Sequence, residues 1–431
     1  MIKSKYTIKN SEIKMKIVIL GVGSMGDVRP CANLAKRLIT RKHDVTLIAY
    51  ERFREYIEGE GIKFTAYPGD SEELMHAIIS GGSNMFKIMS AVKKVYAKDT
   101  DLIRDILIKA CTGADLLLYA TSTSVAMTYI GEGLKIPYVR LNFYPDAPTK
   151  EFRCVNYPEW PFGKLFRGTY NRLSHILCGY FSVRIQKASK KSWLKPLGLK
   201  NSMRLGNKYL DGSGIENLMG YSELVVPACE DYGENIHVVG YFSDVGQEDI
   251  YTPPADVAEF LAKGEKPIYI GFGSVPAGYD NILKTVLDAL KITGKRAFIS
   301  GSWANIEKEK LPENVHLVGY VPHEWLFSQC EAVVQHGGAG STANALRAGK
   351  PTLVVPFGSD QLFWGNRVFE RGLGPKPIHQ KKLTAENLAE AISDLCTPEY
   401  IERAENIGKL LRAEDGVGRA VDFIEKEYGE Q

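Results

Sequence analysis

Polar residues gather in two glycine-containing stretches of the sequence, one in each half of the chain. In the second half, the run HGGAGST begins at His336, directly after the apolar segment AVVQ. A glycine-rich turn between a strand and a helix leaves backbone N–H groups free at the positive end of the helix dipole, and this arrangement binds phosphate. Asp360 and Gln361 follow the next apolar segment, TLVVP, and their side chains suit sugar hydroxyls. This stretch therefore predicts a site for a sugar carried on a diphosphate.

The other stretch follows the apolar segment KIVIL and reads GVGSMGD from Gly21 to Asp27. Asp27 could take a proton from a hydroxyl, or it could instead stabilise the N-terminus of a helix. The glycines also match the GxGxxG pattern of dinucleotide-binding folds, which raises an NAD-linked oxidoreductase as an alternative. That fold places a ribose-binding acid about 20 residues after the glycines. The nearest acid at a strand end, Glu51, lies beyond this distance, which weakens the alternative.

Length and composition exclude several classes of protein. The 431 residues include 44% hydrophobic and 24% charged residues, as in ordinary globular proteins, and the net charge of +3 gives no sign of nucleic-acid binding. No apolar run is long enough to span a bilayer. Seven cysteines without a CxxC pair indicate reduced thiols in a cytoplasmic protein, and no metal-ligand pattern stands out. Residues 1–14 are predicted to form a disordered extension rather than a signal peptide.

Apolar segments alternate with helical patterns along both halves of the chain. Strands are expected at 16–20, 45–49, 116–119, 138–141 and 224–227, and again at 267–270, 297–300, 315–318, 332–335 and 352–355. A helix is expected from about Pro30. The alternation predicts two doubly wound parallel sheets. We expect an N-terminal domain over 15–242, a linker over 243–256 and a C-terminal domain over 257–400.

The segment from Glu151 to Lys200 is strongly basic, with ten Lys or Arg against two acids, so its charge is +8 and the rest of the chain carries −5. An apolar stripe at helical spacing runs through it, formed by Leu173, Ile176, Leu177, Tyr180 and Phe181. The favoured interpretation is a helix that buries this stripe in the core and exposes a basic face. The alternative is a surface that contacts an anionic membrane or an apolar acceptor.

Several motifs together resemble the UDP-glycosyltransferases, glycosyltransferase family 1. They are HGGAGST, RAGKP, VVPFGSDQLFWGNRV and KKLTAENLAEAI, with GYVPHEWLF and GFGS upstream and GSMGDVRP near the N-terminus. The resemblance is strongest to the branch that contains sterol glucosyltransferases and bacterial antibiotic glycosyltransferases. It implies the GT-B fold, an α/β architecture of two facing Rossmann-like doubly wound parallel-sheet domains. It also implies that the C-terminal helix within 401–431 crosses back to the N-terminal domain.

The resemblance further implies roles for individual residues. Asp27 would be the catalytic base, with Ser24 close to the reacting centre. The donor would be bound at its diphosphate by Ser274, His336, Gly338, Ala339, Gly340, Ser341 and Thr342, at its uracil by Tyr320 and Val321, and at its sugar by Asp360 and Gln361. Asn344 stands where many members have a glutamate that binds the ribose hydroxyls. The identity of the donor nucleotide, UDP or TDP, is therefore left open.

These inferences predict an inverting, metal-independent glycosyltransferase. It would move a hexose, with glucose expected, from UDP to a hydroxyl of an apolar acceptor such as a sterol, a lipid or a natural-product aglycone. No cofactor other than the UDP-sugar co-substrate is expected. The alternatives are the NAD-linked oxidoreductase and a non-catalytic protein that binds a nucleotide sugar or a lipid. Loops within 67–89 and 141–199 are expected to line the acceptor site.

Overall fold

The computed structural model describes residues 14–69, 90, 100–120, 124–155, 157, 160–185, 193–199, 215–243, 251–273, 280–301, 311–358 and 360–429. The chain divides into two compact units. Unit 1 comprises Met1–Tyr221, Ala228–Ser243 and Asp415–Gln431, and unit 2 comprises Ser222–Pro227 and Asp244–Glu414. The predicted extension over 1–14 lies outside the described residues except for Lys14, as do residues 244–250 of the predicted linker over 243–256.

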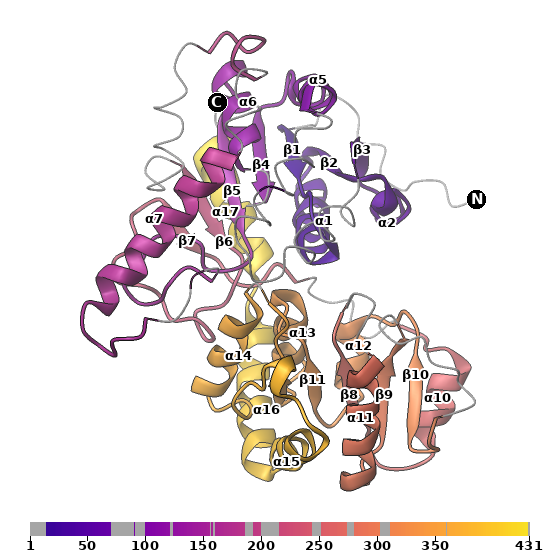
Figure 1. Ribbon diagram of the computed structural model, residues 1–431. Helices are drawn as coiled ribbons and strands as arrows, with labels where there is room; N and C mark the ends of the chain where they lie inside the picture. The colour runs from indigo at the N-terminus through magenta and orange to yellow at the C-terminus, as the bar shows by residue number, and fades with distance from the viewer. Residues whose placement is uncertain are drawn as a thin grey trace. The chain divides into compact units, whose positions relative to one another are not determined.

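Unit 1 is built on a seven-stranded parallel sheet (Figure 1). Its strands are β1 (Lys16–Leu20), β2 (Asp44–Tyr50), β3 (Lys63–Tyr67), β4 (Leu116–Ala120), β5 (Tyr138–Asn142), β6 (Glu216–Met219) and β7 (Ile236–Val238), in the spatial order β3-β2-β1-β4-β5-β6-β7. β1 pairs with β2 on one side and with β4 on the other, so the direction of winding reverses between β1 and β4. In doubly wound sheets, ligands bind outside the carboxyl ends of the strands at this switch point.

The helices of unit 1 are α1 (Met25–Thr40), η2 (Glu51–Phe53), α2 (Arg54–Gly59), α5 (Thr100–Cys111), α6 (Ser124–Leu134), α7 (Arg167–Ile185) and α17 (Gly416–Tyr428). α1 buries Cys31, Leu34, Ala35 and Leu38 on one face. It begins five residues before the expected start at Pro30 because Ser24 and Asp27 form a capping box ahead of the proline.

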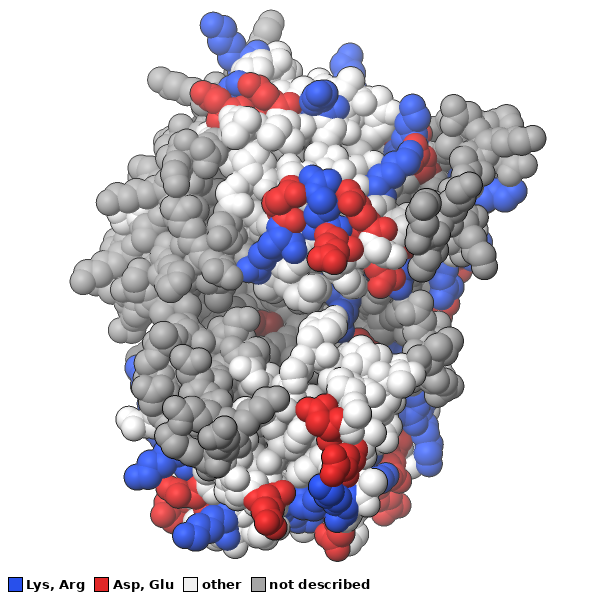
Figure 2. Space-filling model, turned by 90° about the vertical axis from the view of Figure 1, so that its right-hand side faces the viewer, with Lys and Arg blue, Asp and Glu red and all other residues white. Residues whose placement is uncertain are grey.

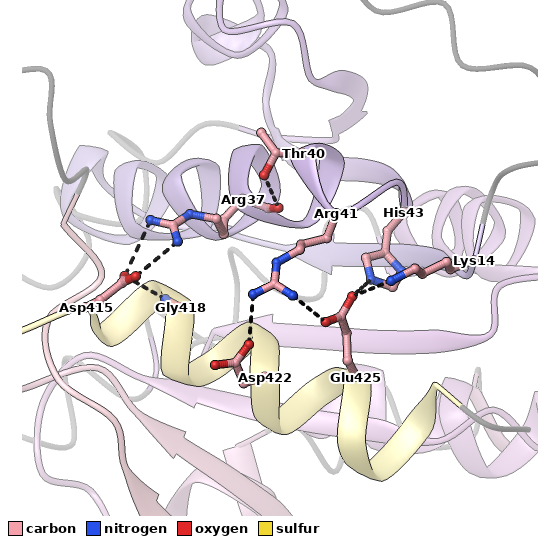
Figure 3. A network of polar contacts seen from close by, with 9 residues as sticks. All are labelled: Lys14, Arg37, Thr40, Arg41, His43, Asp415, Gly418, Asp422 and Glu425. Atoms are coloured by element: carbon pink, nitrogen blue, oxygen red, sulfur yellow. Dashed lines mark hydrogen bonds and ion pairs between the residues drawn. The ribbon is translucent and has the colours of Figure 1, made fainter.

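α17 packs against α1 through apolar and charged contacts. Val417, Ala420, Val421 and Ile424 join the core of unit 1. Figure 3 shows the polar side of the contact, where ion pairs join Arg37 to Asp415 at 3.0 Å, Arg41 to Asp422 at 3.0 Å and to Glu425 at 3.1 Å, and Lys14 to Glu425 at 3.1 Å. The segment 401–431 is thus divided, because the helix before Asp415 belongs to unit 2.

Unit 2 repeats the same winding with five parallel strands (Figure 1). They are β8 (Ile268–Gly271), β9 (Ala297–Ser300), β10 (Val315–Val318), β11 (Val333–Gln335) and β12 (Thr352–Val354), in the order β10-β9-β8-β11-β12. The switch point lies between β8 and β11. The helices are α10 (Ala255–Ala262), α11 (Asp280–Thr293), α12 (His323–Ser328), α13 (Ala339–Arg347), α14 (Gln361–Glu370), η7 (Gln380–Lys382), α15 (Ala385–Leu395) and α16 (Pro398–Ala413). The predicted pair of doubly wound α/β sheets is confirmed.

One strand prediction is wrong. Residues 224–227 form a turn, and the strand next to β5 is β6 instead. Ser222 explains the turn, because its Oγ accepts from the amide of Leu224 at 3.1 Å and its carbonyl oxygen accepts from the amides of Val225 and Val226. Apolar residue types alone do not distinguish such a turn from a short buried strand.

The favoured interpretation of the apolar stripe on α7 is also wrong. Leu173, Leu177 and Tyr180 are 49%, 44% and 44% exposed, whereas Asn171 and Ser174 are buried. The polar side of the helix faces inward because the chain before it supplies hydrogen-bond partners. Asn171 Nδ2 donates to the carbonyl oxygen of Lys150 at 2.8 Å, and the amide of Cys154 donates to Ser174 Oγ at 2.8 Å.

The described surface carries charges of both signs. In the face shown in Figure 2, acidic and basic side chains are interspersed rather than gathered by sign. None of the seven cysteines, all of which lie in the described part of the chain, forms a disulfide. Within the described part of the chain, no helix has the length and apolar character needed to cross a bilayer.

Candidate functional site

The turn between β11 and α13 lies at the switch point of the unit 2 sheet. β11 pairs in parallel with β8 and β12, so the turn follows Gln335 at the carboxyl edge of the sheet. Gly337 has a φ of +97°, and a Cβ there would lie 2.6 Å from the carbonyl oxygen of Gln361. Only glycine fits this position. The close approach places the predicted phosphate turn directly against the predicted sugar-binding segment.

Gln335 holds this turn in place, a role that the motif reading missed. Its side chain is fully buried. Its Oε1 accepts from the amide of Gly337 at 2.6 Å, and its Nε2 donates to Thr342 Oγ1 at 2.9 Å. The side-chain amide of Gln335 therefore connects the glycine turn to the first helical turn of α13. A buried polar side chain needs hydrogen-bond partners, so a glutamine at the end of an apolar strand could have indicated this role in the sequence.

The N-terminus of α13 offers backbone N–H groups to an anion. Its N-cap is Gly338, which has no side chain to cap the helix. The N–H groups of Ala339, Gly340 and Ser341 precede the first intrahelical bond, in which the amide of Thr342 donates to Gly338 O at 2.9 Å. Gly340 is exposed, so a ligand can reach this end of the helix. The geometry suits a phosphate group.

Thr342 does not fit its predicted role in donor binding. Its side chain has no exposed surface, and its Oγ1 accepts the hydrogen bond from Gln335. Adjacent residues of an α-helix point about 100° apart, so Ser341 and Thr342 face different directions. Thr342 supports the turn from the core side, while Ser341 is half-buried at the helix end.

His336 opens the turn and is held neutral. Burial, with a smaller contribution from nearby His323, lowers the pKa of His336 to about 4. Its Nδ1 is buried and has no hydrogen-bond partner among the described residues. A Cβ added to Gly273 would lie 3.2 Å from His336 Cε1, so the turn after β8 packs against the imidazole. A neutral imidazole can donate one N–H to a phosphate oxygen.

Ser274, the predicted diphosphate contact in the GFGS turn, lies outside the described residues. Its neighbour Gly273 is described. Because Gly273 touches the ring of His336, the two glycine turns that follow β8 and β11 lie side by side.

Asp360 and Gln361 are held by specific partners at the start of α14. Asp360 Oδ2 accepts from the indole Nε1 of the fully buried Trp364 at 2.8 Å. Gln361 Oε1 accepts from the amides of Phe357 at 2.7 Å and Gly358 at 3.1 Å. These bonds orient both side chains, which leaves the Gln361 amide nitrogen as a donor for a sugar hydroxyl. Trp364 is a second positioning residue that the sequence reading did not identify.

The residues predicted around the nucleoside lie on the loop before α12 and on α13. Tyr320 is 73% exposed, which leaves ring surface for a base to stack on, and the Val321 side chain is buried. Asn344, in the place of the family's glutamate, donates from Nδ2 to Glu324 Oε1 at 3.1 Å. The structure therefore pairs Asn344 with a carboxylate that α12 supplies.

In unit 1, Ser24 and Asp27 lie together in the turn after β1. Asp27 Oδ2 accepts from the amide of Ser24 at 2.8 Å and from its Oγ at 3.2 Å, and Ser24 Oγ accepts from the amide of Gly26 at 3.2 Å. This is a capping box, so the helix-stabilising role of Asp27 is present. The carboxylate is only half-buried, and it stands at the β1–β4 switch point, where ligands of such sheets bind.

The structure gives no support to the oxidoreductase alternative. Glu51, the nearest candidate for a ribose-binding acid, is paired with Arg54 through contacts of 2.6 and 3.0 Å. A Cβ at Gly23 would lie 2.2 Å from Asp27 Oδ2, so this glycine is required by the capping box itself. The glycine at position 23 is thus explained without a dinucleotide.

Comparisons with known proteins agree with this geometry. Residues 17–153 match the glycosyltransferase family 28 N-terminal domain, and residues 300–413 match the C-terminal domain of erythromycin biosynthesis protein CIII-like proteins. Two solved structures share the fold over nearly the whole chain. The calicheamicin glycosyltransferase CalG4 has a TM-score of 0.71 at 19% identity, covering 97% of this chain and 99% of its own. The kitacinnamycin glycosyltransferase has a TM-score of 0.71 at 18% identity, covering 96% and 99%.

Two curated relatives have a higher sequence identity to this chain than these two solved structures. A sterol 3-beta-glucosyltransferase of Arabidopsis thaliana is 33% identical over 432 residues, which cover 96% of this chain and 68% of that protein. The sterol 3-beta-glucosyltransferase of Komagataella phaffii is 34% identical over 441 residues, covering 98% of this chain and 35% of its own length. The chain thus spans about a third to two thirds of these relatives. It belongs to the UDP-glycosyltransferase family, in the branch that contains the sterol glucosyltransferases and the antibiotic glycosyltransferases.

Proposed function

We propose that the chain transfers glucose from UDP-glucose to the hydroxyl of a sterol, with inversion at the anomeric carbon. The single observation that carries the donor half of this proposal is the uncapped N-terminus of α13 beside neutral His336, with the Gln361 segment packed on the same turn. The acceptor class rests on the sterol 3-beta-glucosyltransferase relatives.

In the proposed reaction, the oxygen of the acceptor hydroxyl attacks the anomeric carbon while Asp27 accepts the proton of that hydroxyl. The bond from that carbon to the diphosphate oxygen breaks, and UDP leaves with the electron pair. A positioned base of this kind contributes about 10²–10⁴-fold. The charge that develops on the diphosphate is met by the N–H groups of Ala339, Gly340 and Ser341 and by the N–H of His336. The reaction as proposed uses no cofactor other than the UDP-sugar.

Asp360 and Gln361 would orient the glucose in this scheme. Because Trp364 and the amides of Phe357 and Gly358 already hold the two side chains, little freedom is lost when the sugar binds. Tyr320 would stack on the uracil, and the Glu324–Asn344 pair would face the ribose side of the nucleotide.

Product analysis tests the proposal directly. The protein is incubated with UDP-glucose or TDP-glucose and with cholesterol, an unrelated hydrophobic alcohol or no acceptor, and the products are identified by mass spectrometry. We expect a steryl glucoside from UDP-glucose. A protein that binds UDP in calorimetry but yields no glucoside with any acceptor would support the non-catalytic alternative instead.

We also propose that α7 contacts an anionic membrane from which the apolar acceptor is drawn. Its outward stripe of Leu173, Leu177 and Tyr180 continues into Leu165 and Phe166, which are 63% and 69% exposed. No acidic residue occurs from 160 to 185, and Lys164, Arg167 and Arg172 are exposed. Exposed apolar residues rimmed by cations are typical of an interfacial helix.

Liposome flotation tests this contact. Leu173→Ser with Leu177→Ser should abolish binding to phosphatidylserine vesicles at low salt, because the apolar stripe is lost while the charge is kept. Leu410→Ser is the matched control, since Leu410 is 56% exposed on α16 in unit 2. Equal flotation of the wild type with neutral and anionic vesicles would contradict the proposal.

A further inference from the structure

The inward side of α7 meets the chain after β5 in a cluster of three residues that the proposed reaction does not use. These are Asp146, Cys154 and His175, and one potential ligand atom from each lies within 4.8 Å of the other two. Cys154 is 1% exposed and His175 is 5% exposed, while Asp146 is half-buried. A thiol, an imidazole and a carboxylate at this spacing are the donor types that bind zinc in proteins.

The hydrogen bonding of His175 leaves one ring nitrogen as a metal ligand. Its Nε2 lies 3.1 Å from the carbonyl oxygen of Phe152. A carbonyl can only accept, so Nε2 carries the proton and Nδ1 keeps its lone pair. Nδ1 is buried and has no hydrogen-bond partner in the part of the chain that the structure describes. A histidine that donates one nitrogen to a backbone carbonyl and presents the other is the usual arrangement at a metal site.

The other two residues are held in a form that suits a cation. Asp146 forms an ion pair with Arg140 of β5, which orients the carboxylate and leaves oxygen lone pairs for a metal. The loop that carries Cys154 is fastened to α7, because the Cys154 amide donates to Ser174 Oγ.

We propose that Asp146, Cys154 and His175 bind a divalent transition metal, with zinc the best match, as a clip between the loop after β5 and α7. Cys154 would bind as the thiolate and release one proton when the metal enters. Three protein ligands leave the fourth position of a tetrahedral site to water. The site would be structural, and it fastens the helix proposed to contact the membrane.

Cobalt(II) binding reads this site without any activity assay. We expect titration of the metal-free protein with cobalt to give a thiolate-to-cobalt charge-transfer band that saturates at one equivalent, and zinc to displace it. Cys154→Ser should remove the band. Cys396→Ser, which changes a partly exposed thiol of unit 2, should keep it. Zinc should also raise the melting temperature of the wild type, because the metal binds the folded state.

A second variant covers the case in which Cys154→Ser does not fold. His175→Gln keeps an N–H for the carbonyl oxygen of Phe152 but lacks the imidazole lone pair, so it should weaken cobalt binding at least tenfold. The proposal is overturned if the wild type gives no charge-transfer band at stoichiometric cobalt. It is equally overturned if the band survives in folded Cys154→Ser, or if it disappears in Cys396→Ser.

Discussion

Trp364 donates its indole N–H to Asp360 Oδ2 at 2.8 Å, which joins a fully buried ring of α14 to a carboxylate at the mouth of the proposed sugar site. The ring itself has no surface with which to touch a ligand. In the proposed site, the ring would act on the donor through Asp360, whose carboxylate accepts the indole N–H. Gln335 acts in the same way on the phosphate turn, through the amide of Gly337.

Trp364→Phe should slow glucose transfer by about tenfold while leaving UDP affinity unchanged. The change removes one hydrogen bond to a charged group, worth about 1.5 kcal/mol or more, and keeps an aromatic ring in the core. Steady-state kinetics with UDP-glucose and calorimetry with UDP separate the two effects. Trp325→Phe, on α12, is the control and should change neither. A parallel loss of UDP affinity in Trp364→Phe would indicate a disordered turn rather than a misplaced Asp360.

His336→Ala should weaken UDP binding and slow transfer by roughly 100-fold, the scale of losing one preorganised donor to a developing anion. Calorimetry and initial rates measure the two quantities. His379→Ala, which changes another half-buried histidine of unit 2, should leave both unchanged. Unaltered UDP affinity in the His336 variant would show that the imidazole does not contact the diphosphate.

Stability should fall as the pH drops below neutral. The pKa of His336 is lowered from 6.5 to about 4 by burial, and burial also lowers the pKa values of His43 and His175. The unfolded chain therefore binds more protons than the folded one between about pH 6.5 and pH 4, so stability is lost as the pH falls through this window. Calorimetric scans at pH 7.5 and pH 5 should show a lower melting temperature at pH 5.

His336→Asn should reduce this pH dependence, because the side chain that replaces histidine does not titrate. The loss of unfolding free energy on acidification should differ between the two proteins by at most on the order of 3 kcal/mol, the equivalent of the shift in the pKa of His336. The melting temperature of His336→Asn should fall less between pH 7.5 and pH 5 than that of the wild type. An identical fall in melting temperature for both proteins would assign the acid sensitivity to other groups.

The sequence predicted much of the fold because its signals were local. Strands such as 16–20 and 297–300 were placed by apolar runs, and they match β1 and β9. The predictions were wrong where hydrogen-bond partners determine the local structure. Leu224 looked like part of a strand until Ser222 supplied the bonds of a turn, and α7 turned its polar side inward because Lys150 and Cys154 offered partners there.

The candidate site shows the same division. The glycine at 337 was predictable because a positive φ and a close approach require glycine, whereas the roles of Gln335 and Trp364 depend on which polar groups their side chains reach. Gln335 and Trp364 carry no motif of their own. The pairing of Asn344 with Glu324 joins residues of two helices, and spacing alone cannot reveal it.

Asp27 is where the two interpretations of the N-terminal turn can be separated. In the capping box Asp27 is the N3 residue, where its carboxylate accepts from Ser24 N–H, and the amide oxygen of asparagine can accept the same hydrogen bond. As a base, it must take a proton, which asparagine cannot do. Asp415→Asn is the control, because Asp415 is another acid at a helix N-terminus, where it accepts from the amide of Gly418 at 2.8 Å.

The most direct test is the rate of steryl glucoside formation by Asp27→Asn under saturating UDP-glucose, measured together with melting temperature and UDP affinity. We predict that the last two quantities stay at wild-type values while the rate falls by about 100-fold or more, the lower end of what a positioned base contributes. Asp415→Asn should keep the wild-type rate. If Asp27→Asn retained most of its turnover with a sterol acceptor, Asp27 would be a helix cap and not the base.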